Sequence, residues 1–227
     1  MSRTAIRGVE IEWIGHAAVK LDGSSTVVID IYPDVLEQTT GEPSSADLIV
    51  STHPHFDHFD PDTINQIADG DTTLIARDGT DLDEVTCSTQ QLGPGESSTF
   101  DDVRVEAVEA YNDHRFRDKD TPYHPQGLGM GVLIELDDLL FYHTGDTDFI
   151  DEMEELGDRD IDVAFLPIGG TYTMDSEEAV EAVKTIQPHK VVPIHYNFID
   201  GTEADPYSFQ ERVEQETDTD VIILEDH

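Results

Sequence analysis

The sequence predicts a mixed α/β (α+β) fold, a four-layer αββα sandwich in which two packed sheets carry helices on their outer faces. Three observations favour this fold class. Short apolar strand patterns recur along the whole chain, helical patterns lie between them, and no linker-like or low-complexity segment divides the chain. Helices and sheets that are apolar on one face bury it in such layers. A chain of 227 residues can enclose one sizeable core, so residues 1–227 are predicted to form a single domain.

The first half is predicted to consist of short strands separated by turns. Val9–Ile14 alternates Val and Ile with Glu, which is the period of a half-buried strand. Thr26–Ile31 and Leu48–Ser51 are apolar runs, typical of strands covered on both faces. Asp60 and Pro61 suit the N-cap and the first position of a helix. Two more strands are expected at Thr73–Ala76 and Val103–Ala110.

The second half alternates strands with helices more regularly. Its clearest helix extends from Asp175 to Gln187, because Asp175 can cap it, Glu178 completes a capping box and Pro188 ends it. The other expected elements are a hairpin of Gly131–Leu136 and Leu139–His143, helices at Ile150–Leu156 and Pro206–Gln215, and strands at Ile161–Pro167, Lys190–Ile194 and Asp220–Leu224.

The composition is strongly acidic. Lys and Arg total 12 against 51 Asp and Glu, which gives a formal net charge of -39. Such repulsion favours disorder in ordinary buffer, yet the apolar runs indicate a folded core. At molar salt the Debye length falls to about 3 Å, so we predict a halophilic protein; the alternative is an acidic protein with a cationic partner. The field opposes contact with nucleic acid or anionic membranes.

The N-terminal segment has no apolar signal region, and no apolar stretch reaches the length of about 20 residues that a membrane helix needs. Cys87 is the one cysteine, so no internal disulfide can form. These features predict a cytoplasmic location. The sequence gives no indication of the oligomeric state.

The strongest chemical signal is the segment from Thr52 to His58, which follows an apolar run. In an extended backbone alternate side chains point the same way, so His53, His55 and Asp57 can converge. His58 follows where the chain turns toward the next helix and can point to a second position nearby. Imidazoles clustered with a carboxylate suit divalent metals such as zinc.

These residues resemble the H-x-H-x-D-H motif of the metallo-β-lactamase superfamily. Asp146, after one strand, and His195, at the end of another, follow in the order of that family's bridging Asp and last ligand His. Within the superfamily the chain is similar to the branch of ascorbate-6-phosphate lactonase-like and uncharacterised metal-dependent hydrolases. The segments that carry this similarity are Trp13–His16, Asp30–Pro33, Leu166–Met174 and Pro193–Tyr196.

The resemblance implies the metallo-β-lactamase fold and two divalent metal ions, most simply Zn²⁺, with Mn²⁺ or Fe²⁺ as alternatives. His53, His55 and a middle ligand would hold one ion, and Asp146 would bridge to the second. The second would also be held by Asp57, His58 and His195. For the middle ligand, His124 is favoured over His114, and Asn112 is the remaining candidate.

The implied activity is a hydrolase in which a hydroxide shared by metal ions about 3.5–4 Å apart attacks a small ester, lactone or phosphodiester. Asp57 is the expected catalytic residue, because it can orient the hydroxide, and the partner is a small-molecule substrate. The alternative is a non-catalytic metal-binding or scaffold protein that retains the fold. Two further residues stay open: His16 either lines the site or packs beside it, and Asp30 either orients a ligand His or belongs to a plain turn.

Overall fold

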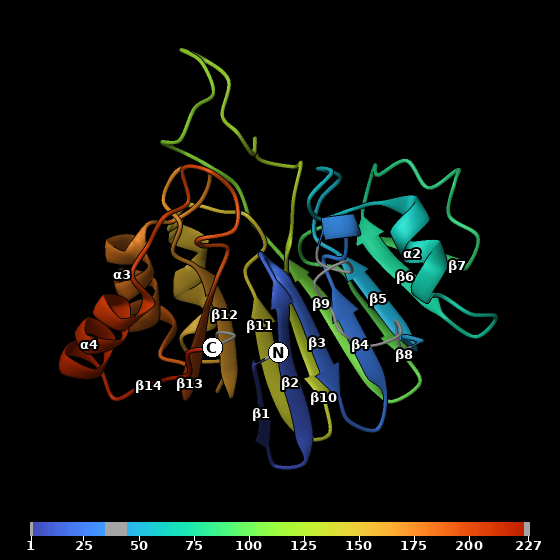
Figure 1. Cartoon of the computed structure of the whole chain (residues 1–227), viewed down its shortest axis with the longest axis horizontal. Coiled ribbons are helices and arrows are strands. Elements are labelled where there is room, and N and C mark those ends of the chain that lie inside the picture. The colour runs from blue at the N-terminus through green and yellow to red at the C-terminus, as the bar shows by residue number, and fades with distance from the viewer. Residues whose placement is uncertain (1, 35–44, 225–227) are drawn as a thin grey trace.

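A computed structural model describes residues 2–34 and 45–224, which form two seven-stranded sheets packed face to face (Figure 1). The first sheet contains, in spatial order, β1 (Ser2–Ile6), β2 (Val9–Gly15), β3 (Ala18–Asp22), β4 (Thr26–Ile29), β5 (Leu48–Ser51), β6 (Thr73–Arg77) and β7 (Ser88–Leu92). The second contains β14 (Asp220–Val221), β13 (Lys190–Ile194), β12 (Val163–Pro167), β11 (Leu139–His143), β10 (Gly131–Leu136), β9 (Val103–Val108) and β8 (Ser97–Phe100).

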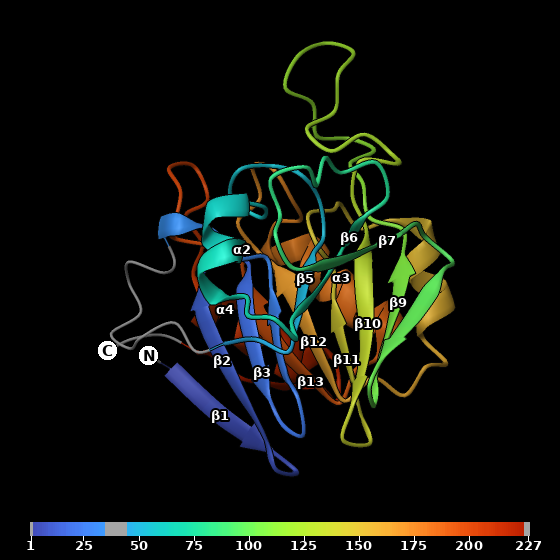
Figure 2. The same cartoon turned by 90° about the vertical axis from the view of Figure 1, so that its right-hand side faces the viewer.

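Helices cover the outer face of each sheet, so the predicted four-layer αββα architecture is confirmed. The helices are α2 (Pro61–Ile67), the 3₁₀ helix η1 (Asp151–Leu156), α3 (Ser176–Ile186) and α4 (Pro206–Glu216). One apolar cluster fills the space between the sheets, a second joins η1, α3 and α4 to the second sheet, and a third lies under α2. Figure 1 shows α2 and α3 on opposite sides of the molecule, and α2 lies in front in the view of Figure 2.

Each sheet changes from antiparallel to parallel pairing halfway across. Strands β1 to β4 and β8 to β11 pair antiparallel, whereas β4 to β7 and β11 to β14 pair parallel. The carboxyl ends of the parallel strands therefore collect at one edge of each sheet. In open sheets with parallel strands, ligands bind beyond these carboxyl ends. The long segment between β9 and β10 rises above this edge in both views (Figures 1 and 2).

Local sequence rules explain where the main helices begin. Asp175 accepts hydrogen bonds from the backbone N–H groups of Glu177 and Glu178, and the Glu178 side chain accepts one from the backbone N–H of Asp175, which is the predicted capping box. Asp60 caps α2 through the N–H of Thr63, directly before Pro61.

Several element boundaries differ from the prediction. The expected strand Thr26–Ile31 ends at Ile29, because Asp30 has a left-handed backbone with φ of 53°. The helix expected at Ile150–Leu156 is a 3₁₀ helix, and the last strand contains two residues rather than five. The strands Ser2–Ile6, Ala18–Asp22, Ser88–Leu92 and Ser97–Phe100 were not predicted. No helix in the described parts of the chain is both long enough and apolar enough to cross a bilayer.

Candidate metal centre

The motif after β5 folds into a tight turn that brings its histidines together. The backbone N–H of His58 donates to the carbonyl of His55 over 3.0 Å, so the chain reverses within the motif. His53 Nε2 lies 3.1 Å from His55 Nδ1, and the rings of His53 and His58 are 4.0 Å apart between centroids. Both His53 and His58 are fully buried.

Asp146 lies at the centre of the cluster, on the loop that follows β11. Its Oδ2 is 3.3 Å from His124 Nε2 and 3.2 Å from His195 Nε2, and its Oδ1 is 3.4 Å from His58 Nε2. The preceding Gly145 has φ of 62°, and a Cβ there would lie 2.6 Å from the Met130 carbonyl oxygen. Only glycine fits this turn, which explains the Gly-Asp pair in the sequence.

The segment between β9 and β10 contributes His124 to the cluster. His124 is buried, and its backbone N–H donates to Asn112 Oδ1 over 2.9 Å. Its ring Nδ1 is 2.8 Å from the same oxygen, so a proton on Nδ1 leaves Nε2 free to face Asp146. His114 is half-exposed and pairs with Asp113 and Glu178 away from the cluster. Of the three candidate middle ligands, only His124 has a donor atom at the centre.

A buried carboxylate that sequence reasoning missed holds this segment in place. Asp148 Oδ2 accepts hydrogen bonds from the N–H groups of Asp113 and His114, each 3.0 Å long. Its Oδ1 accepts from Asn112 Nδ2 over 2.9 Å and from Arg115 Nη1 over 2.6 Å. Arg115 also pairs with Glu178 of α3. In the sequence, Asp148 is marked only by its place two residues after Asp146, and acidic residues are frequent throughout the chain.

The carboxylate of Asp30 contacts both His58 and Thr52 of the histidine segment. One oxygen, Oδ2, lies 2.8 Å from His58 Nδ1 and accepts from Thr52 Oγ1, while Oδ1 accepts from the Thr52 N–H. Asp30 is fully buried. It therefore fixes which nitrogen of His58 faces the centre, which favours the first of the two roles left open for Asp30, the orientation of a histidine.

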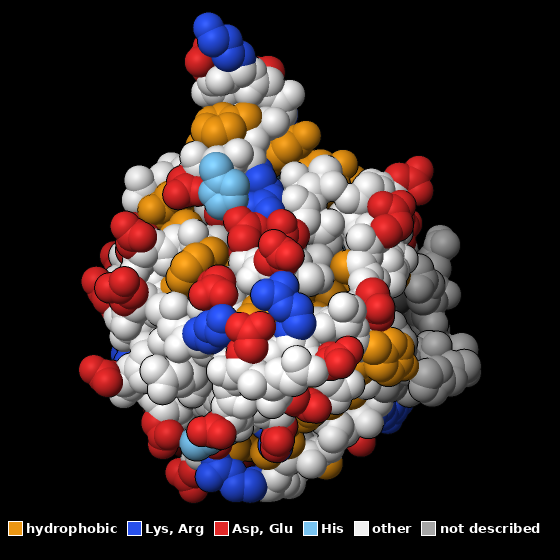
Figure 3. Space-filling model, turned by 90° about the vertical axis from the view of Figure 1, so that its left-hand side faces the viewer, with side chains coloured by type: hydrophobic (Ala, Val, Ile, Leu, Met, Phe, Trp, Pro, Cys, Tyr) orange, Lys and Arg blue, Asp and Glu red, His pale blue; other side chains and the backbone are white. Residues whose placement is uncertain are grey.

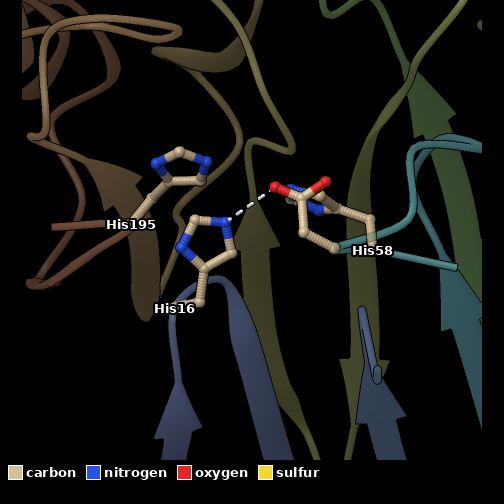
Figure 4. A group of neighbouring side chains, drawn as sticks. His16, His58 and His195 are labelled. Carbon is tan, nitrogen blue, oxygen red and sulfur yellow. Dashed lines mark hydrogen bonds and ion pairs between the residues drawn. The ribbon is translucent and has the colours of Figure 1, made fainter. Parts of the chain in front are cut away.

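His16 is the further histidine in this group. It is fully buried, and its Nε2 lies 3.2 Å from Asp57 Oδ2. Figure 4 shows its ring beside those of His58 and His195, with a dashed line to a carboxylate. The ring centroids of His16 and His195 are 3.9 Å apart. His16 is therefore part of the buried cluster, whereas the His143 ring lies with Nε2 2.9 Å from the Ala17 carbonyl oxygen.

Burial and charge set the protonation of these groups. Burial lowers the pKa of His124 to about 4 and that of His16 to about 4, and it holds the pKa of His53 well below its usual range. These imidazoles are neutral at pH 7, the form that binds metals. Burial opposes ionisation of Asp146, but His195 and His58 beside it hold its pKa well below the usual range.

The residues fit a divalent metal centre. Three sets of residues at this centre each have donor atoms that all lie within 4.8 Å of one another. They are His53, His55 and His124; His53, His58 and Asp146; and His16, Asp57, His58 and His195. Within the described chain, the buried atoms His58 Nε2, His195 Nε2 and Asp146 Oδ1 make no hydrogen bond. Buried polar atoms are costly unless satisfied, and a cation would satisfy all three.

Paired mixed sheets with a histidine and aspartate centre at their carboxyl edge define a metallo-hydrolase architecture of the metallo-β-lactamase fold. A family model described as a beta-lactamase superfamily domain matches residues 10–195. A UPF0173 metal-dependent hydrolase of Methanosphaerula palustris is 37% identical, over 95% of this chain and 96% of that protein. One from Pyrococcus horikoshii is 33% identical, with the same shares covered. The chain therefore belongs to the UPF0173 metal-dependent hydrolases of the metallo-β-lactamase superfamily.

Solved structures agree with this fold. A candidate metal-dependent hydrolase from Parabacteroides distasonis has a TM-score of 0.84 and 29% identity, covering 99% of both chains. Igni18, a metallo hydrolase from the archaeon Ignicoccus hospitalis, has a TM-score of 0.77 and 26% identity, covering 96% of this chain and 95% of that one.

Proposed function

We propose that this protein hydrolyses a small ester, lactone or phosphodiester with two divalent ions, most simply zinc, bound at the centre. His53, His55 and His124 would hold one ion. Asp57, His58 and His195 would hold the other, and Asp146 would bridge them. The observation that carries this proposal is the position of Asp146, whose two oxygens lie within 3.4 Å of ring nitrogens from three separate segments. Imidazole and carboxylate donors suit Zn²⁺, and also Mn²⁺ or Fe²⁺.

Bound divalent ions supply a water molecule with a pKa of about 7 and a Lewis acid for the oxyanion that develops during attack. The protein residues would then position the attacking water and accept its proton. Asp57 borders the pocket above the cluster, where its carboxylate can accept a hydrogen bond from the attacking water and direct it. His16 contacts Oδ2 of that carboxylate, whose two oxygens have further lone pairs for the ion and the attacking water. Asp30 and Asn112 keep His58 and His124 turned toward the centre.

Replacing Asp57 tests this proposal. We expect the Asp57→Ala protein to retain at least the ion held by His53, His55 and His124, but to lose kcat by about 10²–10⁴-fold, the usual contribution of a positioned acid or base. The measurement combines metal analysis with hydrolysis of chromogenic esters, lactones and bis-p-nitrophenyl phosphate at high salt.

The matched control is Asp62→Ala, which removes an exposed carboxylate from the first turn of α2. Full activity in Asp57→Ala would refute the role of Asp57. Silence of the metal-loaded native protein across the whole panel would instead favour a non-catalytic metal-binding protein.

A further inference from the structure

The candidate metal centre forms the floor of a pocket with apolar walls. The pocket has a volume of about 250 Å³, slightly below the range of roughly 300–1,000 Å³ that is typical for drug-sized ligands. Its floor consists of His55, Asp57, His124, Asp146 and His195, and its walls of Phe56, Tyr123, Tyr172 and Ile199. Reacting atoms at the floor would therefore be next to an apolar surface.

Two tyrosines from distant segments build one wall together. The rings of Tyr123 and Tyr172 meet edge to face, with centroids 5.0 Å apart and planes at 89°. Tyr123 directly precedes His124, and Tyr172 lies on the loop after β12, where its carbonyl accepts a hydrogen bond from Asn112 Nδ2. The network that positions His124 thus also places this aromatic pair. Edge-to-face pairs of this kind are a favourable aromatic geometry.

Phe56 forms one wall of the pocket and is unusually exposed to solvent for a large apolar residue. It stands between His55 and Asp57 in the histidine motif, yet its side chain is 76% exposed, the largest value among the exposed large hydrophobic residues of the described chain. A large apolar side chain next to a polar centre has no role in the core, because it contacts mainly solvent. An exposed apolar surface beside polar groups is typical of a ligand-binding site.

The described residues that line the pocket include no Lys or Arg. Near the pocket, Arg115 pairs with Asp148 and Glu178, and the exposed Arg117 donates to the carbonyl of Tyr123. An anionic group remote from the reacting bond would lose hydration in a lining that offers it no cationic side chain. The net charge of -39 adds a field that repels anions.

We propose that the substrate is an uncharged carboxylic ester or lactone with an aromatic group next to the bond that is cleaved, held between Phe56, Tyr123 and Tyr172. This inference rests on the proposed hydrolase function and names the substrate class of the same site. The aromatic ring fills the apolar walls, and the ester carbonyl reaches the floor. Hydrolysis then adds water across the acyl C–O bond and releases a carboxylate and an alcohol.

The kinetic test compares three methyl esters with the zinc-loaded protein in molar KCl: methyl phenylacetate, its para-carboxylate analogue and methyl butyrate. We expect kcat/KM to be about tenfold higher for methyl phenylacetate than for either of the others, the low end of what apolar pocket contacts discriminate. Equal kcat/KM values for the three esters would overturn this substrate class while leaving the hydrolase function intact. A higher kcat/KM for the anionic analogue or for bis-p-nitrophenyl phosphate would do the same.

A binding test does not depend on turnover. Ligand-observed NMR compares 2-phenylacetamide with butyramide on the native protein, on Tyr172→Ala and on Tyr207→Ala. Tyr207 is 52% exposed on α4 and lies outside the pocket lining, so it is the matched control. We expect tighter binding of the aromatic amide, weakened about tenfold by Tyr172→Ala only. Failure of 2-phenylacetamide to bind, binding no tighter than that of butyramide, or undiminished binding to Tyr172→Ala would overturn the inference even if no ester is hydrolysed.

Discussion

His16 contacts three residues from separate segments, Trp13, His195 and Asp57. Its backbone is left-handed, with φ of 52°, and its carbonyl oxygen accepts hydrogen bonds of 2.8 Å from both Trp13 Nε1 and the N–H of His195. Its ring meanwhile contacts the Asp57 carboxylate. Non-glycine residues with positive φ are concentrated at functional sites, and Asp30 and His195 in this centre share the feature.

Removing the His16 ring tests its role as a positioning residue. In His16→Ala the Asp57 carboxylate loses the partner of its Oδ2 and can rotate, so we expect kcat to fall about 10–100-fold, the usual effect of losing an outer partner of a metal site. Steady-state kinetics and metal analysis should give an unchanged KM and an unchanged ion at His53, His55 and His124. His16→Gln, whose amide can donate to Asp57, should recover part of the lost kcat. A change in KM with unchanged kcat would contradict this role.

The histidine motif could be predicted from its own residues after an apolar strand, whereas Asp146 and His195 were expected from the resemblance to the superfamily; all lie next to strand ends at the sheet edge. The structure brings all seven predicted ligand side chains together. The contribution of Asp148 could not be predicted, because it depends on a contact with Arg115, which lies 33 residues away in the sequence. Asn112 was one of the open candidates, and it acts on His124 instead of entering the cluster.

The segment between β9 and β10 depends on one buried anchor. Asp148→Asn keeps the shape of the side chain but removes the charge that faces Arg115. We expect the free energy of unfolding to fall by about 3 kcal/mol, because breaking a buried charge pair is strongly destabilising, although Glu178 still pairs with Arg115. Urea denaturation and metal analysis should also show weaker binding of the ion at His53, His55 and His124.

The control for this substitution is Asp113→Asn, at an exposed carboxylate in the same segment whose side chain pairs with His114. It should change stability and metal content little. Equal effects of both substitutions would show that Asp148 has no special part in holding the segment.

Strand β9 is tied to the region after η1 by a charge pair with a pH signature. Hydrogen bonds from Arg159 are the main reason that the pKa of Glu106 is lowered to about 2. A carboxyl with a lowered pKa contributes stability above its unfolded value of about 4.3, and the contribution is lost as the pH falls toward 2. We expect the stability difference between the native protein and Glu106→Gln to be largest above pH 5 and to shrink below pH 4 in urea titrations. A difference that grows with acidity would contradict this assignment.

Most strands and helices could be predicted at the element scale, because buried strands such as β5 and β13 are continuous apolar runs. The missed strand β7 is Ser-Thr-Gln-Gln-Leu with four exposed side chains, so no apolar period marks it. Its pairing with β6 comes from the neighbouring strand rather than from its own residues. The 3₁₀ geometry of η1 also has no sequence signal, since Ile150 lacks a side-chain cap.

At the scale of the whole molecule, the acidic surface dominates. Figure 3 shows acidic side chains spread over the face that contains α3 and α4. The few basic residues there are shared: Lys184 pairs with Glu181 and Glu216, and Arg212 with Glu177 and Glu216. Most carboxylates therefore repel one another across the surface, and dissolved cations are the remaining source of screening.

We expect the melting temperature to rise by about 6–12 °C between 0.1 M and 3 M KCl, the shift that corresponds to about 3 kcal/mol of relieved repulsion for a chain of this size. Calorimetry at pH 7 measures the shift. Sucrose at matched water activity is the control, since it carries no charge. A melting temperature that does not rise with KCl would remove the proposal of a halophilic protein.

The site draws on segments from both sheets, beginning at His16 and ending at His195, and this order has a consequence for biosynthesis. While the ribosome is still translating β12, the nascent polypeptide already displays the histidine motif but lacks the last imidazole. In the proposed two-ion site, complete capture of the ions would wait until β13 has emerged and docked. Bound ions would then link one sheet to the other, so we expect chelation to loosen the interface between the sheets as well as to stop the proposed hydrolysis.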